Sequence, residues 1–306
     1  LTTRIIGKMD DQDWLGEYTP EKTAAVMAKV WHDLLPPPKM PPFDTLQVPE
    51  RPAQLCPGCG HRSAFYAIKQ ALAETDITVA DIGCHTLGYL PPYEVGQLLM
   101  CMGASTGMAS GLSLFNDSRR VVAFLGDSTF FHAALPGVIN AIFNRHAVTL
   151  IVMENGTTAM TGHQDHAASG RNFNDVTDKI PIRQVLEGLG IERIYEVDTY
   201  QQAQLKKLVE QALDDEGFSV VIARHPCMLK FTREQRRRDN FQLRQVTVDQ
   251  EICEQIHACV ATFGCPSFVR HADGRVTVNP DLCIGDGSCL QSCPAGAIEK
   301  PKAAGA

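Results

Sequence analysis

The sequence has few aromatic residues and no long apolar run. Aromatic side chains make up 7% of the 306 residues. No uninterrupted apolar stretch reaches the roughly 18 residues that span a bilayer, so we expect no membrane partner. Positive charge is also scarce: the formal net charge is −7, which argues against nucleic acid as a main partner. The chain starts at Leu1 with no initiator methionine or secretory signal, so we expect a cytoplasmic protein and a piece of a longer one.

Cysteine, in contrast, is abundant, with 11 residues in the chain. An odd number, close C-x-x-C spacing and the lack of a secretory signal favour metal binding over disulfides. The length suffices for one large domain and a small module. We expect a helix and a proline-rich linker in residues 1–49, an α/β domain in 50–240 and a cysteine-rich module in 241–306. The helix should begin at Thr19-Pro20, a capping residue followed by proline.

The centre of the chain predicts a βαβ unit. Residues 121–125 and 148–153 are apolar runs of strand length, and a helical stretch over 134–143 lies between them. The carboxyl ends of two parallel strands lie at the same edge of a sheet, where open α/β sheets bind ligands. We therefore expect Asp127 and Asn155 to converge there. A carboxylate, an amide oxygen and nearby carbonyls are hard ligands that suit Mg²⁺.

The remaining elements alternate in the manner of an α/β domain. A helix over 95–114 should bury Cys101 as a core thiol. The charged stretch 232–240 is expected to be a solvated boundary, with Arg236–Arg238 as a candidate contact for phosphate or ferredoxin. The other expected helices are 63–74, 182–190 and 202–213, and the other expected strands are 78–82, 191–197 and 218–223.

Four cysteines lie at turns or strand ends that one sheet edge could gather. Cys56 and Cys59 flank a Pro-Gly turn, and Cys84 and Cys227 each follow a predicted strand. A C-x-x-C pair is used by zinc sites, redox dithiols and iron–sulfur sites alike. Four thiolates together suit either zinc or a [4Fe–4S] cluster.

The tail contains two further sets of cysteines, each ending in Cys-Pro. The first is Cys253, Cys259 and Cys265, and the second is Cys283, Cys289 and Cys293. The arrangement resembles that of bacterial two-cluster ferredoxins, in which the cysteine before each proline ligates the other cluster. That resemblance implies one cluster on Cys253, Cys259 and Cys293, and another on Cys283, Cys289 and Cys265.

Each set lacks the second cysteine of the ferredoxin pattern. Ile256 stands at that position in the first set and Asp286 in the second. Isoleucine cannot bind iron, so the first site should hold [3Fe–4S]. Asp286 could ligate a fourth iron through oxygen, which would give an aspartate-ligated [4Fe–4S] or again [3Fe–4S]. A module that keeps its fold but has lost its clusters remains an alternative.

Residues 50–305 resemble the C-terminal half of the large subunit of the indolepyruvate ferredoxin oxidoreductase family. The matching segments are LCPGCGHRSAFYAIK, ADIGCHTLGYLPP, CMGASTGMASG, LGDSTFFHAALPGVINAIFN and ENGTTAMTGHQ. The resemblance implies an α/β fold: a parallel-sheet domain that binds thiamine diphosphate (ThDP), followed by a small α+β two-cluster ferredoxin-like module.

The family's site residues carry over onto matching positions. The GDS…EN pattern resembles the ThDP signature GDG…NN, with departures at Ser128 and Glu154. It implies that Asp127, the Asn155 side chain and the Thr157 carbonyl hold Mg²⁺. The proximal cluster would bind Cys56, Cys59, Cys84 and Cys227. The expected cofactor-binding residues are Gly126, Asp127, Ser128, Thr129, Asn155, Thr157, Thr161 and Gly162.

The implied activity is ThDP-dependent oxidative decarboxylation of an arylpyruvate-type 2-oxoacid. Electrons would pass through the clusters to ferredoxin, and coenzyme A would take the acyl group, a chemistry typical of anaerobic metabolism. A pyrimidine-binding ThDP domain or subunit and a smaller second subunit are further expected partners. No residue of this chain matches the glutamate that activates the cofactor, so we expect the chain alone to be inactive. His132, His163 and His166 are candidates for the substrate carboxylate.

Two other functions fit parts of the pattern. A non-oxidative ThDP decarboxylase would need no iron, and ten clustered cysteines weigh against it. An electron-transfer subunit with a vestigial ThDP fold would need no Mg²⁺, and the intact Asp127 and Asn155 weigh against that. Iron content distinguishes the first alternative, and Mg²⁺-dependent ThDP binding distinguishes the second.

Overall fold

A computed structural model describes residues 8, 10–31, 52–116, 119–237 and 245–300. The chain divides into two compact units, Leu1–Pro52 and Ala53–Ala306. In the first unit, helix α1 (Pro20–Val30) begins where expected, because the Thr19 side chain accepts a hydrogen bond from the Lys22 amide. The 3₁₀ turn η1 (Asp11–Trp14) precedes it. Most of the expected proline-rich linker lies outside the described residues.

The second unit contains a five-stranded sheet in the order β1-β2-β3-β5-β4, with every strand pair parallel. The βαβ prediction is confirmed, since β2 and β3 pair in parallel from Val122↔Thr149 onward and a helix connects them. The strand bounds are β1 (Ile77–Val79), β2 (Val121–Gly126), β3 (Val148–Glu154), β4 (Ile194–Asp198) and β5 (Phe218–Arg224).

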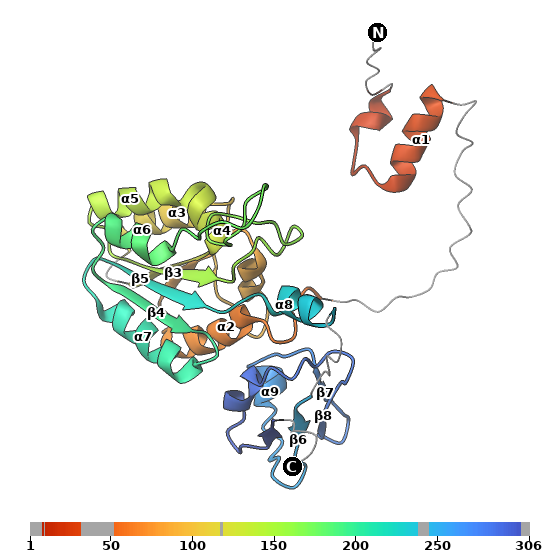
Figure 1. Ribbon diagram of the computed structural model, residues 1–306, viewed down its shortest axis with the longest axis vertical. Coiled ribbons are helices and arrows are strands. Elements are labelled where there is room, and N and C mark those ends of the chain that lie inside the picture. The colour runs from red at the N-terminus through yellow and green to blue at the C-terminus, as the bar shows by residue number, and fades with distance from the viewer. Residues whose placement is uncertain (1–7, 9, 32–51, 117–118, 238–244, 301–306) are drawn as a thin grey trace. The chain divides into compact units, whose positions relative to one another are not determined.

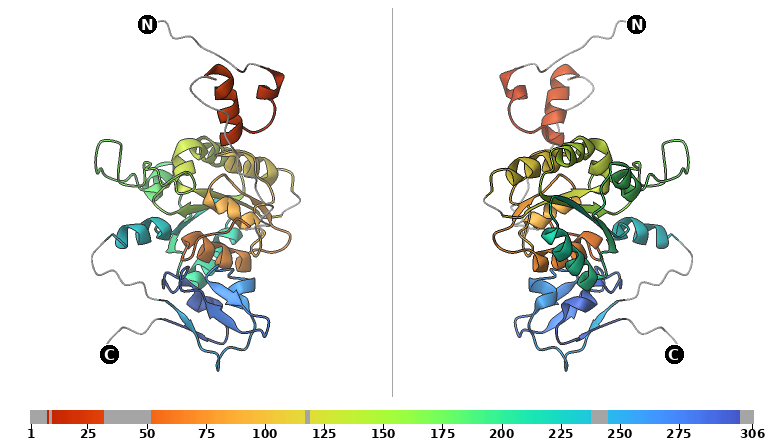
Figure 2. Two further views of the ribbon diagram at one scale, coloured as in Figure 1. Left: turned by 90° about the vertical axis from the view of Figure 1, so that its right-hand side faces the viewer. Right: turned by 90° about the vertical axis from the view of Figure 1, so that its left-hand side faces the viewer.

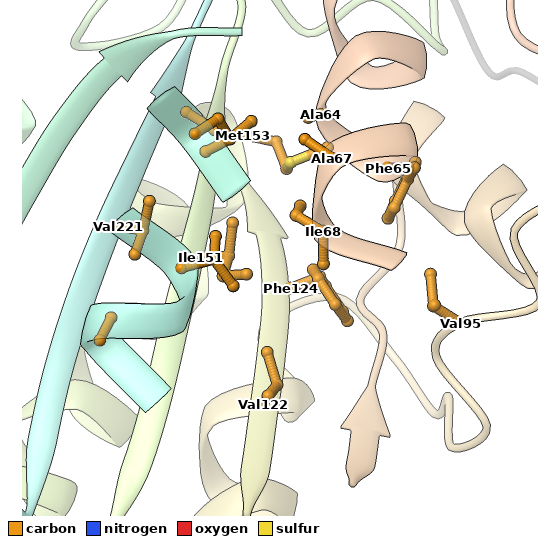
Figure 3. Packing of buried hydrophobic residues seen from close by; sticks show 14 of the residues in the cluster. Ala64, Phe65, Ala67, Ile68, Val95, Val122, Phe124, Ile151, Met153 and Val221 are labelled. Carbon is orange, nitrogen blue, oxygen red and sulfur yellow. The ribbon is translucent and has the colours of Figure 1, made fainter. Parts of the chain in front are cut away.

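Helices cover both faces of the sheet, so its central strands read as unbroken apolar runs. One face packs against α3 (Ala104–Ser113), α5 (Leu135–Phe143) and α6 (Ile182–Gly188), and the other against α2 (Gly60–Ala71) and α7 (Gln202–Asp214) (Figure 1). In the α2 layer, Phe65 and Ile68 lie against Phe124 and Ile151 of the sheet (Figure 3). This parallel α/β architecture is the one expected from the sequence.

The prediction of a helix over 95–114 is wrong for its first half. Residues 95–103 are not helical: Leu98 forms an isolated parallel bridge with Val79, residues 101–103 form a bend and a turn, and α3 starts only at Ala104. Gly96 and Gly103 have φ of +88° and +87°, values that end a helix rather than continue one. Cys101 is consequently exposed in this segment, and the prediction that it is a buried core thiol is also wrong.

The helix after β2 starts with a distorted turn. A short α4 (Asp127–Thr129) leads into the π-helical segment η3 (Phe130–Ala134), and α5 follows without a break. Pro136 lies in the first turn of α5 and has no N–H to donate to the preceding turn, which accounts for the wider spacing. Such π-helical turns occur frequently at functional sites.

The tail forms a small module with little regular structure (Figure 2). Its two sheets have two strands each: β6 (Thr247–Val248) with β9 (Ile298–Glu299), and β7 (Phe268–Arg270) with β8 (Val276–Val278). The helical turns are α9 (Ala258–Ala261) and η4 (Ser288–Ser292). Its core combines apolar side chains with two buried cysteines: Val246, Phe263, Phe268, Val276, Cys283, Cys289 and Ile298.

The segment before the module is more ordered than expected. Helix α8 (Met228–Gln235) takes up the first part of the stretch expected to be a solvated boundary, and Thr232 is buried on it. Arg238 lies outside the described residues. Among the helices that the structure describes, none combines the length and the apolar character needed to cross a bilayer.

Candidate functional site

Asp127 lies at the carboxyl end of β2, and its carboxylate accepts hydrogen bonds from three backbone amides. Its Oδ1 accepts a hydrogen bond from the Ser128 amide at 2.8 Å. Its Oδ2 accepts from the Asn155 amide at 2.9 Å and from the Gly156 amide at 2.6 Å. The predicted convergence of Asp127 and Asn155 is therefore confirmed. The imidazole Nε2 of buried His166 lies 3.4 Å from Asp127 Oδ2, although its direction makes no hydrogen bond.

The loop after β3 orients the remaining oxygens. Asn155 Oδ1 accepts a hydrogen bond from the Thr157 amide at 3.0 Å. Thr158 donates its hydroxyl to Ser128 Oγ at 2.8 Å, and Ser128 Oγ also lies 3.1 Å from His132 Nδ1. Hydroxyl, amide and carboxylate groups are thus concentrated at the ends of β2 and β3, which is the edge predicted to bind Mg²⁺ and a diphosphate.

Two buried histidines add neutral imidazoles to this edge. Burial lowers the pKa of His61 to about 3, and nearby His85 lowers it further, while Asp127 opposes the shift. Burial likewise lowers the pKa of His85 to about 4. Asn155 Nδ2 lies 3.3 Å from His61 Nε2, so the amide can donate to the neutral ring. His85 Nε2 has no hydrogen-bond partner among the described residues and is available to a bound group.

A cavity of about 50 Å³ lies between these groups. Of the residues predicted to bind the cofactor, it is lined by Gly126, Asp127, Ser128, Thr129, Asn155 and Thr157. Thr161 and Gly162 are not among the lining residues, and the exposed Thr161 hydroxyl donates instead to Gln164 Oε1 at 2.7 Å. His163 lies away from this cavity as well, with its Nε2 3.6 Å from Cys227 Sγ.

The four predicted proximal cysteines surround a second cavity, of about 200 Å³. Cys56 and Cys59 reach it from the turn before α2, Cys84 from the 3₁₀ helix η2 (Cys84–Tyr89), and Cys227 from the start of α8. Burial raises the pKa of Cys59 to about 12 and that of Cys84 to about 11. Uncompensated thiolates are therefore unfavourable here, and a cationic centre would stabilise them.

The cysteines line the cavity and do not meet at one point. Within the described ranges, no three His, Cys, Asp or Glu side chains lie close enough together to hold a single metal ion. The two cavities are neighbours, because five residues line both of them: His61, Cys84, Asn155, Ala159 and Met160. A group bound at the Asp127 edge would thus be separated from the cysteine cavity by one layer of side chains.

Several of the module's cysteines affect one another's thiol pKa. Burial, together with the charges of Cys293 and Cys253, raises the pKa of the Cys259 thiol to about 11. Burial and the charges of Asp286, Cys265 and Cys283 raise the pKa of Cys289. At the two positions without cysteine, Ile256 is 54% exposed, and Asp286 accepts a hydrogen bond from the Ser288 amide at 2.9 Å.

Sequence reasoning missed two buried charged residues that organise the site. Asp81 accepts hydrogen bonds from the amides of Gly103 and Ser105 at 2.8 and 3.0 Å, and so fixes the start of α3. Arg62 donates to the carbonyls of Leu55 and Gly264, which ties the cysteine turn to the module. Neither residue has a distinctive spacing. The available signal was their position beside Cys59 and Cys84 in the sequence.

Two segments of the chain match known protein families. Residues 81–223 match the thiamine pyrophosphate enzyme C-terminal TPP-binding domain, and residues 276–299 match the 4Fe-4S binding domain. Among solved structures, the 2-oxoglutarate:ferredoxin oxidoreductase from Magnetococcus marinus shares the fold. Its TM-score is 0.52 at 20% identity, covering 63% of this chain and 75% of that one.

Curated relatives are similar over most of the chain. The indolepyruvate oxidoreductase subunit IorA of Methanothermobacter marburgensis is 40% identical over 260 residues, which is 83% of this chain and 41% of the relative. The same subunit of Methanothermobacter thermautotrophicus is 38% identical over 269 residues, which is 86% of this chain and 42% of the relative. The chain thus spans less than half the length of these relatives. Over these residues the chain is similar to the indolepyruvate oxidoreductase subunit IorA.

Proposed function

We propose that the chain is the ThDP- and cluster-binding part of a 2-oxoacid:ferredoxin oxidoreductase. In this reaction a 2-oxoacid loses CO₂, its acyl group passes to coenzyme A with loss of the thiol proton, and two electrons leave one at a time for ferredoxin. The observation that carries the proposal is the wall of five residues shared by the Asp127 cavity and the four-cysteine cavity. Cofactor chemistry and electron removal need this adjacency.

The residues at the Asp127 edge fit Mg²⁺ and a diphosphate. Three backbone amides fix the Asp127 carboxylate, and its oxygens keep lone pairs for a hard cation. Asn155 Oδ1 and the Thr157 carbonyl are oxygen ligands of the same kind. The Ser128 and Thr129 groups beside them are suited to the diphosphate. When bound, ThDP supplies the nucleophilic carbon and the electron sink for decarboxylation.

The protein's own groups prepare this edge for reaction. His61 and His85 stay neutral at physiological pH, so they can donate or accept hydrogen bonds without adding charge beside Asp127. His85 Nε2 is buried and has no hydrogen-bond partner among the described residues, so it is free to bond a substrate carboxylate or keto oxygen. Met102 and Met160 add apolar surface to the lining of the cavity.

The four-cysteine cavity fits a [4Fe–4S] cluster better than a single zinc ion. Zinc draws its four ligands to about 2.3 Å from one point. The cysteines here instead surround a space of about 200 Å³. We propose further clusters in the module, [3Fe–4S] at the Ile256 site and [3Fe–4S] or aspartate-ligated [4Fe–4S] at the Asp286 site. An arylpyruvate such as indolepyruvate is the proposed substrate, because the IorA relatives are named for it.

The experiment that tests the proposal uses the chain together with a pyrimidine-binding partner, under anaerobic conditions with ThDP, Mg²⁺ and coenzyme A. Rapid mixing with indolepyruvate should bleach the cluster absorbance, and Asp127→Asn should abolish the bleaching while leaving dithionite reduction intact. Decarboxylation without cluster reduction would identify a non-oxidative decarboxylase. Cluster reduction by dithionite without Mg²⁺-dependent ThDP binding would identify a simple electron-transfer subunit.

A further inference from the structure

The turn between Cys56 and Cys59 lies directly against the module. Gly58 has φ of +67°, and a β-carbon on it would overlap Ile284 Cδ1 and come within 3.0 Å of Asp286 Oδ1. Ile284 follows Cys283, and Asp286 occupies the missing ligand position of the same site. The proximal turn and the Cys283–Cys289 loop are therefore in van der Waals contact.

Tyr200 joins these two loops. Its hydroxyl donates a hydrogen bond to the Gly58 carbonyl at 2.7 Å, and its own carbonyl accepts one from Gln291 Nε2 at 2.5 Å. The side chain thus bonds the proximal turn while its main chain bonds the module.

The Tyr200 ring is itself fixed. It stacks on the His225 ring with centroids 3.6 Å apart and planes at 20°. His225 Nδ1 lies 3.1 Å from Asp198 Oδ1 at the end of β4. Next to this stack, Gln202 Nε2 donates to the Ser288 carbonyl at 2.8 Å. Gly58, Tyr200 and Gln202 of the sheet domain therefore all contact the module loop 283–291.

The contacts between the domain and the module favour one of the two module sites. Ile284 adjoins Cys283, and Ser288 adjoins Cys289. Arg62 and Tyr93 reach the carbonyls of Gly264 and Phe263, and Gly264 adjoins Cys265. These contacts lie beside the cysteines of one site, which we call the near site: Cys283, Cys289 and Cys265. We call the other site the far site: Cys253, Cys259 and Cys293. The Gln291 contact with Tyr200 lies two positions from both Cys289 and Cys293.

We infer that Tyr200 is a positioning residue that fastens the near site to the proximal cluster, so that the near site receives each electron first. This rests on the proposed function. The step moves one electron: the proximal cluster is oxidised by one unit, the near cluster is reduced by one unit, and no bond is formed or broken. The rate of electron tunnelling falls steeply with distance. The contact that Tyr200 maintains therefore determines which module cluster the proximal cluster reduces first.

The first test is Tyr200→Phe, which keeps the ring stack and removes only the hydroxyl. Amide exchange of residues 283–291 in the cluster-loaded full chain should become about tenfold faster, as expected for the loss of one buried hydrogen bond. Tyr195→Phe is the matched control, because Tyr195 lies on β4 shortly before Tyr200 and its hydroxyl donates a hydrogen bond to Asp215 Oδ2 at 2.9 Å, away from the module. Equal exchange in Tyr200→Phe and the control would overturn the positioning role.

The second test identifies the near site by electron paramagnetic resonance of the dithionite-reduced chain. A neighbouring paramagnet speeds the spin relaxation of the proximal cluster. Cys289→Ser should slow this relaxation severalfold, and Cys259→Ser should change it little. The opposite pattern would overturn the order of the sites while leaving the proposed function standing. A chain that binds no iron at the proximal site would overturn both.

Discussion

The sheet domain and the tail module are stabilised in different ways. The domain buries strands of up to 7 residues between two helical layers, and two large hydrophobic clusters lie on the two faces of its sheet. The module has strands of 2 or 3 residues, and cysteines make up part of its core. Hydrophobic burial can therefore stabilise the domain without a cofactor. The module buries too little apolar surface for this, and we expect the metal bound by its cysteines to supply folding free energy.

Removal of iron should produce the largest difference in stability between the sheet domain and the module. Anaerobic chelation should abolish amide protection across residues 245–300 and leave it in β2 and β3. The reason is that the module loses its main source of stability, whereas the sheet core has no iron ligand. Hydrogen exchange read by mass spectrometry checks this. Retained protection in the module after complete loss of iron would show that its apolar core is sufficient.

Substitution of one core phenylalanine in each region compares the stability of the sheet domain with that of the module. Phe124 and Phe263 are buried to 1% and 0% exposure in the domain and the module, respectively. Phe124→Ala should cost about 3–5 kcal/mol of unfolding free energy for the sheet domain. Phe263→Ala should loosen only the module and its contact with Tyr66, a ring 5.5 Å away. Denaturant unfolding followed by region-resolved exchange distinguishes a global from a local effect, and a global effect of Phe263→Ala would refute the distinction.

Mild acid should weaken the domain through its buried histidines. His61 and His85 have pKa values near 3 and 4 when folded, against 6.5 as the ordinary value. Below pH 6.5 the unfolded chain binds these protons and the folded chain does not, so stability falls as pH falls. Going from pH 7 to pH 5 should cost about 2 kcal/mol per histidine. In His85→Phe, the free energy of unfolding measured by denaturant titration should depend on pH about half as strongly as in the unaltered chain. An equal pH dependence in the two proteins would contradict the role of His85.

Gly58→Ala should have the smallest effect on stability but a specific one. The left-handed backbone at φ +67° costs an alanine about 1–2 kcal/mol. The added methyl group also displaces Ile284 from the proximal turn. We expect unchanged cluster content and a looser module, measured as faster exchange in residues 283–291. Gly296→Ala, also at positive φ but with open space around it, is the matched control.

The sequence predicted the central strands well because they are mostly apolar runs of strand length. The expected strands 121–125 and 148–153 correspond to Val121–Gly126 and Val148–Glu154, and the ends of these strands bring Asp127 and Asn155 together. The segment at 95–103 was mistaken for helix, because the conformation of Gly96 and Gly103 depends on tertiary contacts. Asp81 is one such contact, and its role could not be inferred from spacing.

Polar contacts between residues far apart in the sequence are the other feature that could not be predicted. The predicted grouping of cysteines followed from a known pattern, whereas the contact of Tyr200 with Gly58 joins residues 142 positions apart. No local periodicity encodes such a pair. The same holds for Arg62 and Gly264, which are separated by 202 positions. The parts of the site that the sequence missed are therefore the ones that position one cofactor site relative to another.

Iron and acid-labile sulfide should be measured on the anaerobically purified chain and on Cys84→Ser. We expect about ten to eleven irons per chain, from one [4Fe–4S] and two incomplete clusters. Cys84→Ser should lose about four irons, or keep them only in a labile cluster, while the module's irons stay. Zinc in place of iron at the four cysteines, or full iron content in Cys84→Ser, would contradict this expectation.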